Sequence, residues 1–367
     1  MPTTTAYILP RKIYVLWALV QLVLVLVFGI NTQLEAAKYA TEASYLLSHH
    51  SFSEPKYWFY SVQIVLHVLA QWLHIPQQSI YLVQLSMNLL ALHYLYQLWK
   101  QFYTLEKATF AALVWMAFLP LQEWTTHLYT ESIFVSVVCI WMYYLVQYLT
   151  RRQYLKHLAI CSIALVFIRP TGMLFLPIAG MAIFWQLPSS RRYFLWAGLP
   201  LLLGFYALLA TAMRGQGEFD FLLPFKEGHI ICGLPTYPTP IAFEGDAQSL
   251  TGIVAFVWHY PWEFISLAGQ RLWAFWSIYR SYYSPLHNIV YTGFFVALYV
   301  GVFVAWKQAL PAFKTIAFCT ALVFSVSVMI TCDDWHSRFL LPVLPSLFVL
   351  LPTGLPKRLG KYVRYIH

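Results

Sequence analysis

Trp58-Phe-Tyr-Ser-Val-Gln63-Ile-Val-Leu-His67-Val-Leu-Ala-Gln71-Trp-Leu-His74-Ile75 is the stretch of sequence that decides how this chain is folded. It is apolar enough to cross a bilayer, but glutamines and histidines interrupt it and polar residues flank it. If this stretch crosses the membrane, every later loop changes sides. The charges in the rest of the chain therefore decide whether it lies across the membrane or along its surface.

The whole chain has the composition of a membrane protein. Of its 367 residues, 60% are hydrophobic and 10% are charged, whereas soluble domains have about 25% charged residues. Apolar runs long enough to cross about 30 Å of hydrocarbon recur from Ile13 to Leu350, with no long polar segment between them. We expect one all-α integral membrane domain over residues 1–367. Its first span is too long for a cleaved signal peptide.

With residues 58–75 on the membrane surface, the sequence predicts about ten transmembrane helices and two cytoplasmic termini. Residues 31–78 then form a first outer loop with surface helices, and residues 214–286 form a long outer loop that lies on the interface. The predicted spans are residues 13–30, 79–98, 108–121, 131–149, 157–168, 171–186, 193–213, 287–306, 315–332 and 339–354.

The distribution of charge agrees with this topology. It places 15 of the 23 lysines and arginines on the cytoplasmic side and 13 of the 14 acids on the outer face, with Glu106 as the exception. A crossing helix at 58–75 would put the basic clusters after residue 99 outside, against the positive-inside rule. The net charge of +9 therefore reflects membrane orientation, and we expect no nucleic-acid partner.

Glu35, Tyr39 and Glu42 are predicted to share one face of a short outer helix. Residues 31–47 are rich in helix formers and contain no Gly or Pro. Spacings of four and three residues bring the two carboxylates and the phenol together. One interpretation is a general base. The other is a solvated helix face with Glu35 paired to Lys38, and the spacing leaves both open.

The second outer loop contributes His127 and Glu131. Glu131 lies where the chain re-enters the membrane, and a carboxylate at that depth needs a physical reason. It could orient an acceptor hydroxyl or a metal ion, or it could cap the following helix, because an acid suits a helix N-terminus. We give these interpretations equal weight.

Arg169 lies in a turn between two short predicted spans. A charge there is costly unless it faces a hydrated cavity or a partner, so we expect the turn to line a cavity. Arginine suits bidentate recognition of phosphate, whereas the alternative is a side chain that snorkels to water. The phosphate interpretation is favoured, because Pro170 and the short flanking spans hold the residue in place.

The densest polar cluster is the last outer segment, with Asp333, Asp334, His336 and Arg338 within six residues. The cluster could be a second phosphate contact with flanking orienting groups, or an Asp–Arg pair that caps the last helix. A metal site of the two aspartates and the histidine is poorly supported, because the spacing fits no defined metal motif.

Absent motifs narrow the chemistry further. The sequence contains no P-loop and no dinucleotide-binding glycine fingerprint, which argues against a nucleotide-driven pump and a nucleotide-sugar enzyme of soluble type. We expect the donor to be lipid-borne. Cys232 and Cys332 both fall in outer segments, but the sequence does not decide whether they are bonded.

Four places in the chain together resemble the GT-C superfamily of membrane glycosyltransferases, in particular protein O-mannosyltransferases and lipid A aminoarabinose transferases. They are the run Glu35-Ala-Ala-Lys-Tyr39 followed by Leu46-Leu47, Thr130-Glu131 at the fourth span, Ile168-Arg169-Pro170-Thr-Gly172, and Arg338-Phe-Leu-Leu-Pro342 before the last span. Such enzymes have outer helices before their second span, which agrees with a surface position for residues 58–75. Two residues depart from the usual pattern: Glu35 stands for Asp, and Phe339 for Tyr.

The resemblance implies inverting transfer of a sugar from a polyprenyl-phosphate donor to a glycan, lipid or protein acceptor, on the outer, periplasmic or lumenal face of a bacterial inner membrane. Glu35 would be the general base, and Arg169 and Arg338 would bind the donor phosphate. Substrate-orienting roles would fall to Tyr39, Glu42, His127, Glu131, Asp333, Asp334 and His336. No residue is assigned to a metal ion, although a divalent metal remains open.

Two rival functions remain. A flippase or transporter of lipid-linked sugars should carry charges inside several spans, whereas here no acid lies deep in a predicted span. A lipid-linked glycan polymerase or ligase shares the compartment and the lipid carrier, and the sequence does not separate it from a transferase.

Overall fold

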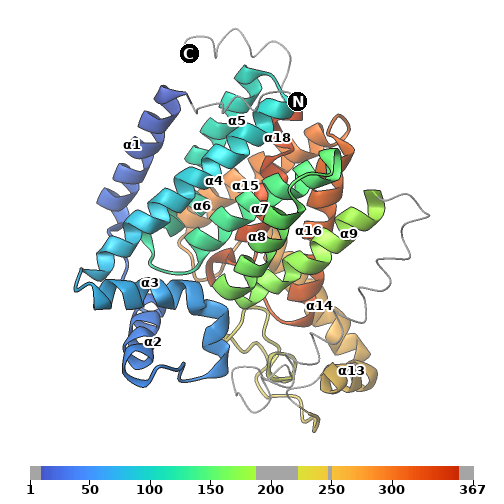
Figure 1. The fold of residues 1–367 in the computed structure, drawn as a ribbon. Coiled ribbons are helices and arrows are strands. Elements are labelled where there is room, and N and C mark those ends of the chain that lie inside the picture. Colours follow the sequence, from blue (N-terminus) through green and yellow to red (C-terminus); the bar gives the residue numbers. More distant parts are fainter. Residues whose placement is uncertain (1–9, 187–221, 247–249, 355–367) are drawn as a thin grey trace. The chain divides into compact units, whose positions relative to one another are not determined.

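A computed structural model describes residues 10–186, 222–246 and 250–354 (Figure 1). Within these residues the chain forms helices joined by turns, with two isolated β-bridges and no strand. The predicted span 193–213 and the start of the long outer loop lie outside the described residues. The described helices confirm an all-α fold.

Five helical segments in the described ranges are long and apolar enough to cross a membrane: α1 (Arg11–Phe28), α7 (Glu131–Arg151), α15 (Pro285–Trp306), α16 (Pro311–Ile330) and residues Trp335–Thr353. Two shorter apolar segments are α8 (Leu155–Ile168) and Pro170–Gln186, which contains η4 (Pro170–Leu174) and α9 (Phe175–Gln186). These segments fit a multi-pass membrane protein, and the full count of about ten stays a prediction.

The chain divides into two compact units, which are described separately. Among the described residues, unit 1 comprises 10–176, 294–317 and 344–354, and unit 2 comprises 177–186, 222–246, 250–293 and 318–343. The division falls within α15 and α16, so each of these helices contributes one part to each unit. Whether the whole chain acts as one domain stays a prediction.

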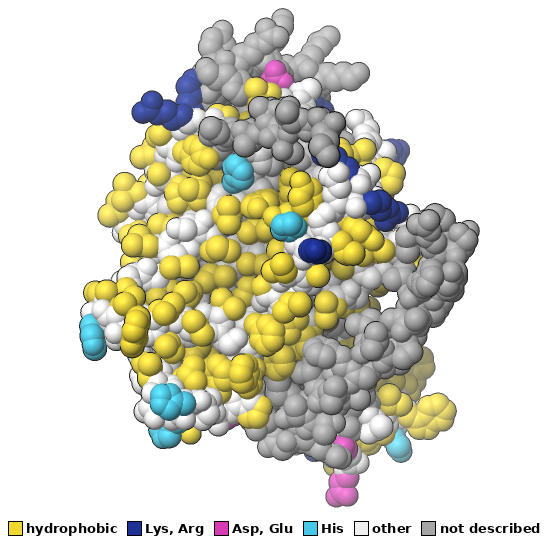
Figure 2. All heavy atoms as spheres, in the orientation of Figure 1, with side chains coloured by type: hydrophobic (Ala, Val, Ile, Leu, Met, Phe, Trp, Pro, Cys, Tyr) yellow, Lys and Arg dark blue, Asp and Glu magenta, His cyan; other side chains and the backbone are white. Residues whose placement is uncertain are grey.

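Helix α7 is the centre of unit 1. It packs against α4 (Ile80–Phe102) and α8, and α4 also packs against α5 (Leu105–Ala117). In α7, 78% of the most apolar 18-residue window is buried, against 17% in α1. A helix that is apolar all round belongs in an interior, whereas the exposed leucines and valines of α1 suit contact with lipid tails. Figure 2 shows hydrophobic side chains over much of the visible surface.

Five short helical segments gather at one end of the unit 1 helices. They are α2 (Glu35–His49), η1 (Pro55–Tyr60), α3 (Ser61–Trp72), α6 (Leu119–Gln122) and η3 (Glu123–Thr126). Figure 1 shows α3 lying across the direction of α4 and α7. With 12 residues, α3 spans about 18 Å at 1.5 Å per residue, which is too short to cross a bilayer. It buries Gln63, Ile64, His67 and Ala70 and exposes Val65, Leu69 and Trp72.

The two ends of the unit 1 helices carry opposite charges. The turns at 103–104, 152–154 and 307–310 and the start of α1 lie at the end opposite α2 and α3 (Figure 1). Their neighbouring cations are Arg11, Lys12, Lys100, Lys107, Arg151, Arg152, Lys156, Lys307 and Lys314, with Glu106 as the one acid. The described acids of the other end are Glu35, Glu42, Glu54, Glu123 and Glu131, and they outnumber its three cations, Lys38, Lys56 and Arg169. We call these the basic end and the acidic end.

Two predicted spans are broken by proline. The span expected at 108–121 ends as α5 at Ala117, and Pro120 is the second residue of the separate short helix α6. The span expected at 339–354 is a series of short segments, η8 (Leu341–Val343), α17 (Leu344–Phe348) and α18 (Leu351–Gly354). Proline lacks the N–H that a continuous helix needs, and Pro342, Pro345 and Pro352 recur too often for one.

Unit 2 contains the described part of the long outer loop. It forms α12 (Leu223–Lys226), α13 (Leu250–His259) and α14 (Pro261–Ser277), packed around Leu222, Phe225, Ile253, Phe256 and Leu267. A disulfide joins Cys232 to Cys332, with a Cα–Cα distance of 5.3 Å. The adjacent bridge between Ile231 and Asp333 fastens this loop to the last outer segment.

Candidate functional site

The acidic end of unit 1 is built around a contact between the two outer loops. The backbone N–H of Asn31 donates to the Thr126 carbonyl at 2.9 Å, and the N–H of Leu128 donates to the Asn31 carbonyl at 3.1 Å. This bridge between Asn31 and His127 fixes the start of α2 beside the segment that leads into α7. Glu35 and Glu131, 96 positions apart in the sequence, are therefore on two segments that are tied together.

Glu35 and Tyr39 are brought together as predicted. The Tyr39 hydroxyl donates to Glu35 Oε2 at 3.2 Å, and the phenol is buried while Glu35 is half-buried. A half-buried carboxylate held by a buried phenol is oriented but still reachable from outside. A carboxylate so placed could accept a proton from a group bound beside it.

Glu42 has a different place from Glu35, although both lie on the same helix face. Its carboxylate is buried and accepts hydrogen bonds from the Ser53 backbone N–H at 2.7 Å and from the Ser53 hydroxyl at 2.5 Å. Glu42 therefore anchors the loop between α2 and η1. These contacts make it a structural residue in the described fold, and the expected substrate-orienting role has no contact that supports it.

His67 belongs to this site, and the sequence interpretation treated it only as an interruption of an apolar run. Its ring lies 6.5 Å from the Tyr39 ring and is completely buried. Burial lowers the pKa of His67 to about 4, although the nearby Leu128 carbonyl opposes the shift. The imidazole is therefore neutral at pH 7. The sequence contained one signal that could have found His67. It lies four positions after Gln63, and residues four apart share a helix face.

Two amide side chains fix the segment before Glu131. Gln63 donates from Nε2 to the Leu128 carbonyl at 3.0 Å, and Gln84 of α4 donates from Nε2 to the Tyr129 carbonyl at 2.9 Å. Both amides are buried. Because buried carbonyls need partners, these bonds hold the backbone in one position directly before α7 begins.

Glu131 and Arg169 form a buried ion pair with each other. Glu131 Oε1 accepts from an Arg169 Nη, and the side chains are 1% and 8% exposed. Glu131 opens α7 and Arg169 follows the last residue of α8, so the pair joins two helix ends. A buried charge pair is costly to desolvate. The sequence analysis had given the two residues separate roles and did not predict that they pair.

The Arg169 turn is shaped by glycine. The N–H of Gly172 donates to the Arg169 carbonyl at 2.8 Å. A Cβ at position 172 would lie 2.0 Å from the Leu165 carbonyl oxygen, so the turn accepts no other residue without moving the backbone. The Ser61 hydroxyl donates to the Phe167 carbonyl at 3.5 Å, which ties α3 to this turn.

His127 lies at the acidic end as expected. Its Nδ1 is 3.2 Å from the Glu123 carbonyl and 3.3 Å from the Thr126 hydroxyl. Its ring centroid is 5.4 Å from those of Trp124 and Tyr129. The ring is only partly buried, so one edge is held by the loop and the residue remains accessible.

In unit 2, Asp333 pairs with Arg280, a residue that the sequence analysis did not single out. Both side chains are completely buried. Asp333 accepts from an Arg280 Nη, and the same guanidinium donates to the Ser337 hydroxyl at 3.0 Å. Burial raises the pKa of Asp333 to about 7, while Arg280 and the Asp334 N–H oppose the shift. No short-range signal could have found this pair, because its members are 53 positions apart.

The remaining residues of the last outer segment lie nearer the surface. Arg338 Nε is 3.8 Å from Asp334 Oδ2, which is the Asp–Arg pair that one sequence interpretation expected. His336 is exposed, has a φ of +54°, and its Nδ1 lies 2.7 Å from the Tyr283 hydroxyl. In the described ranges no three His, Cys, Asp or Glu side chains are placed to hold a metal ion together.

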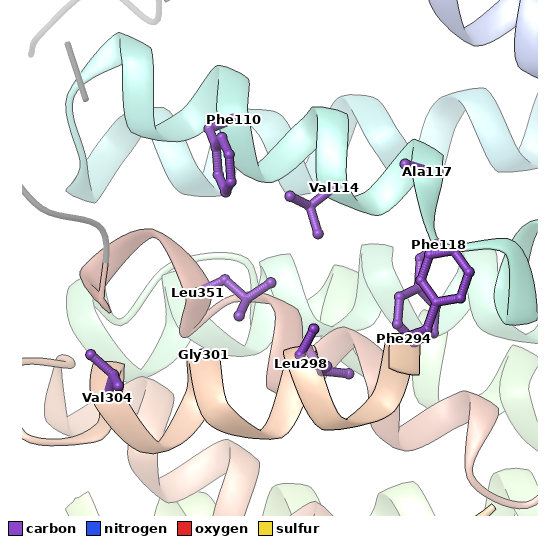
Figure 3. Close-up of a pocket in the computed structure, with 10 residues that line it drawn as sticks. Phe110, Val114, Ala117, Phe118, Phe294, Leu298, Gly301, Val304 and Leu351 are labelled. Carbon is purple, nitrogen blue, oxygen red and sulfur yellow. The ribbon is translucent and has the colours of Figure 1, made fainter. Parts of the chain in front are cut away.

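Unit 1 also contains an apolar groove of about 400 Å³ between α5 and α15 (Figure 3). Phe118 closes one end, with its ring centroid 5.4 Å from that of Phe294. Val304 and Leu351 line the end nearer the basic turns (Figure 3). The other lining residues are Phe110, Val114, Ala117, Ala297, Leu298 and Gly301.

Comparisons with protein-family models, with characterised proteins and with solved structures found no match to this chain. The resemblance to GT-C glycosyltransferases therefore stays a prediction from the sequence.

Proposed function

We propose that the protein is a GT-C-like membrane glycosyltransferase that takes a sugar from a polyprenyl-phosphate donor. The observation that carries the proposal is the acidic end of unit 1. There a half-buried carboxylate, Glu35, is held by Tyr39 on a segment tied to the one that leads into the buried Glu131–Arg169 pair. An oriented base and a fixed guanidinium are the two groups that transfer from a lipid phosphate needs.

The proposed topology has about ten spans, with the acidic end on the periplasmic or lumenal face and the basic end in the cytoplasm. It is supported by the separation of charge between the two ends of unit 1, which follows the positive-inside rule. A bacterial inner membrane is the proposed location, because the sequence resembles bacterial members of the GT-C superfamily.

In the proposed reaction, Glu35 takes the proton of an acceptor hydroxyl or amine. The acceptor oxygen or nitrogen then forms a bond to the anomeric carbon, and the bond from that carbon to the phosphate oxygen breaks with inversion. The electron pair leaves on polyprenyl phosphate. Tyr39 orients Glu35, and His127 lies on the tied loop as an additional polar contact for the acceptor.

Arg169 is proposed to stabilise the departing phosphate. Guanidinium offers five N–H donors in a planar fork, and Glu131 fixes its orientation from one side. Preorganised donors aimed at developing charge contribute more than flexible ones, because no reorganisation is needed during the reaction. The sequence resemblance alone proposes Arg338, a residue of unit 2, as a second phosphate contact, and within that unit its Nε lies 3.8 Å from Asp334 Oδ2.

The apolar groove of unit 1 is the proposed seat of the donor's lipid chain. Its lining is aliphatic and aromatic (Figure 3), and its Phe118 end adjoins α6 and η3, the segments that lead to His127 and Glu131. A chain in this groove would place its phosphate toward the acidic end.

A transfer assay in proteoliposomes tests the proposal. The probes are polyprenyl-phosphate mannose, glucose and aminoarabinose, labelled in the sugar, with envelope extract as acceptor; released polyprenyl phosphate and labelled acceptor are both measured. Glu35→Gln should lower turnover by about 10²- to 10⁴-fold, the usual contribution of general-base catalysis. Glu106→Gln, at the basic end, is the matched control and should keep full turnover.

Each other outcome has a definite meaning. Full activity of Glu35→Gln would remove it as the base. Movement of labelled lipid across the bilayer without release of polyprenyl phosphate would indicate a flippase. Ala297→Trp, which fills the groove, should weaken use of long-chain donors, whereas Val296→Trp on the same helix lies outside the groove lining and should not.

A further inference from the structure

Unit 2 contains a second groove, which the proposed transfer does not use. It has a volume of about 640 Å³ and lies between one face of α14 and residues 230–236. This volume is within the usual 300–1,000 Å³ of ligand sites. Its lining residues are Ile230, Ile231, Leu234, Thr236, Ile265, Ser266, Gly269, Gln270, Trp273, Ala274, Ser277, Tyr279, Arg280 and Ser281.

The α14 face of the groove has an exposed aromatic ring at one end and small or polar residues beside it, which form the floor of the groove. Trp273 is 74% exposed, so its ring face is available at one end. A Cβ added at Gly269 would meet no atom within 4 Å, which leaves room one helical turn away. Gln270 donates from Nε2 to the Ser266 hydroxyl at 3.2 Å, so amide and hydroxyl groups lie on the same floor.

The wall opposite α14 is held in place. The disulfide between Cys232 and Cys332, together with the Trp335 indole N–H that donates to the Cys232 carbonyl at 3.1 Å, anchors residues 230–236. The other face of α14 is fixed by Arg271, whose Nε donates to the His229 carbonyl at 2.7 Å. A groove between two fixed walls loses little conformational entropy when a ligand binds.

The charge of the groove selects among ligands. Of the lining residues, Arg280 alone carries a formal charge at pH 7, and its guanidinium is bound to Asp333 and Ser337. A phosphate or carboxylate ligand would therefore find no uncompensated cation. A lipid chain would bury the Ser266 and Gln270 side chains without new hydrogen bonds, which is costly.

We infer that this groove binds a neutral carbohydrate chain. The apolar faces of sugar rings stack on exposed aromatic rings such as Trp273, and sugar hydroxyls hydrogen-bond to amides and hydroxyls such as those of Gln270 and Ser266. As the seat of a glycan acceptor, the groove deepens the proposed function and rests on it. The binding of a neutral glycan itself does not depend on catalysis.

Isothermal titration calorimetry of the full-length protein in nanodiscs tests the inference, with mannotetraose, maltotetraose and the N-acetylglucosamine tetramer as probes. At least one tetrasaccharide should bind, and Trp273→Ala should weaken binding at least tenfold. Gly269→Leu, which fills the open floor, should abolish it. Trp262→Ala is the matched control, because Trp262 is 77% exposed on the same helix but does not line the groove.

Several results would overturn the inference: no binding of any probe to the unaltered protein, or equal binding by Trp273→Ala, Gly269→Leu and Trp262→Ala. A co-purified lipid that is lost only in Gly269→Leu, as seen by native mass spectrometry, would assign the groove to lipid instead. Retention of the Cys232–Cys332 disulfide shows that a variant has folded. Glycan binding without donor turnover would contradict the proposed function alone, and turnover without glycan binding would contradict this inference alone.

Discussion

Among the described residues, each unit contains a completely or almost completely buried acid–arginine pair, and the two pairs are built differently. Arg280 is completely buried and donates to Asp333, to Ser337 and to the Ala274 and Tyr279 carbonyls. Arg169 meets Glu131 at the junction of two helix ends, beside loops that carry accessible polar groups. The Arg280 guanidinium is occupied by structural partners on several sides, whereas the Arg169 guanidinium joins two helix ends, and there we propose that it meets the donor phosphate.

Burial alone therefore does not identify a functional charge. A charge pair inside a protein is expensive, and both pairs carry that cost. The cost has a structural explanation in unit 2, where the pair fastens the last outer segment to α14 and its following turn. In unit 1 we propose that the same cost positions a phosphate-binding group.

The largest expected effect is on the stability of unit 2. Asp333→Ala at pH 8, where the carboxylate is ionised, leaves Arg280 buried without its anion. Removal of one partner of a buried pair costs about 3–5 kcal/mol, which thermal unfolding in detergent would report. Asp334→Asn, beside it in the sequence, removes a partly exposed charge but keeps a side-chain oxygen for the Trp335 N–H that Asp334 accepts, so it should cost less than Asp333→Ala. Equal losses in the two variants would mean that the buried pair is not structural.

The next effect is on catalysis in unit 1. Arg169→Lys keeps a positive charge beside Glu131 but loses the planar fork that suits phosphate. We expect kcat/KM for the polyprenyl-phosphate donor to fall about ten- to hundredfold, or about 1.4–2.7 kcal/mol, with only a small change in melting temperature. Arg280→Lys should show the reverse, with lower stability and an unchanged kcat/KM per folded molecule. Unchanged donor kinetics in Arg169→Lys would contradict the phosphate role.

The two units should also respond oppositely to pH. The pKa of Asp333 is raised from 3.8 to about 7, so between about pH 4 and 7 folded unit 2 keeps a proton that the unfolded chain has lost. Its stability therefore falls as pH rises through this window. The pKa of His67 is lowered from 6.5 to about 4. The unfolded chain then binds a proton that folded unit 1 does not, and stability falls as pH drops below about 6.5.

Hydrogen exchange followed by mass spectrometry, corrected for intrinsic rates, would separate these two trends. Between pH 7 and 5, peptides from α3 should lose protection while peptides from residues 331–338 gain it. His67→Gln should flatten the first trend, and Asp333→Asn the second. A change of the same sign in both regions would show that neither group controls its unit.

The sequence predicted the elements of this fold better than their contacts. Apolar runs placed the predicted spans 13–30, 131–149 and 157–168 within two residues of α1, α7 and α8, because a hydrophobic run is a local signal. The break of the last span was not predicted. Pro342, Pro345 and Pro352 are visible in the sequence, but the high hydropathy of the segment was given more weight than its prolines.

The candidate site was predictable where its residues are neighbours in the sequence. Glu35 and Tyr39 met as expected, because a spacing of four fixes their contact on a helix. The Glu131–Arg169 pair, the Arg280–Asp333 pair and the Cys232–Cys332 disulfide join residues 38, 53 and 100 positions apart. Such contacts depend on how helices pack, and a single sequence carries no local signal for them.

The smallest expected effect is on the KM for the donor when Arg338 is changed. It tests whether Arg338 binds the donor phosphate or only supports the fold. Arg338 is mostly buried, and its Nε lies 3.8 Å from Asp334 Oδ2. Arg338→Gln keeps a polar side chain, and its melting temperature is measured beside the KM so that lost stability is separated from lost donor binding. If Arg338 binds the donor phosphate, the KM for the polyprenyl-phosphate sugar should rise several-fold, whereas Asp334→Asn, which removes only the partner, should raise it less. Equal KM values in both variants and in the unaltered protein would leave Arg169 as the single phosphate-binding arginine of the proposed site.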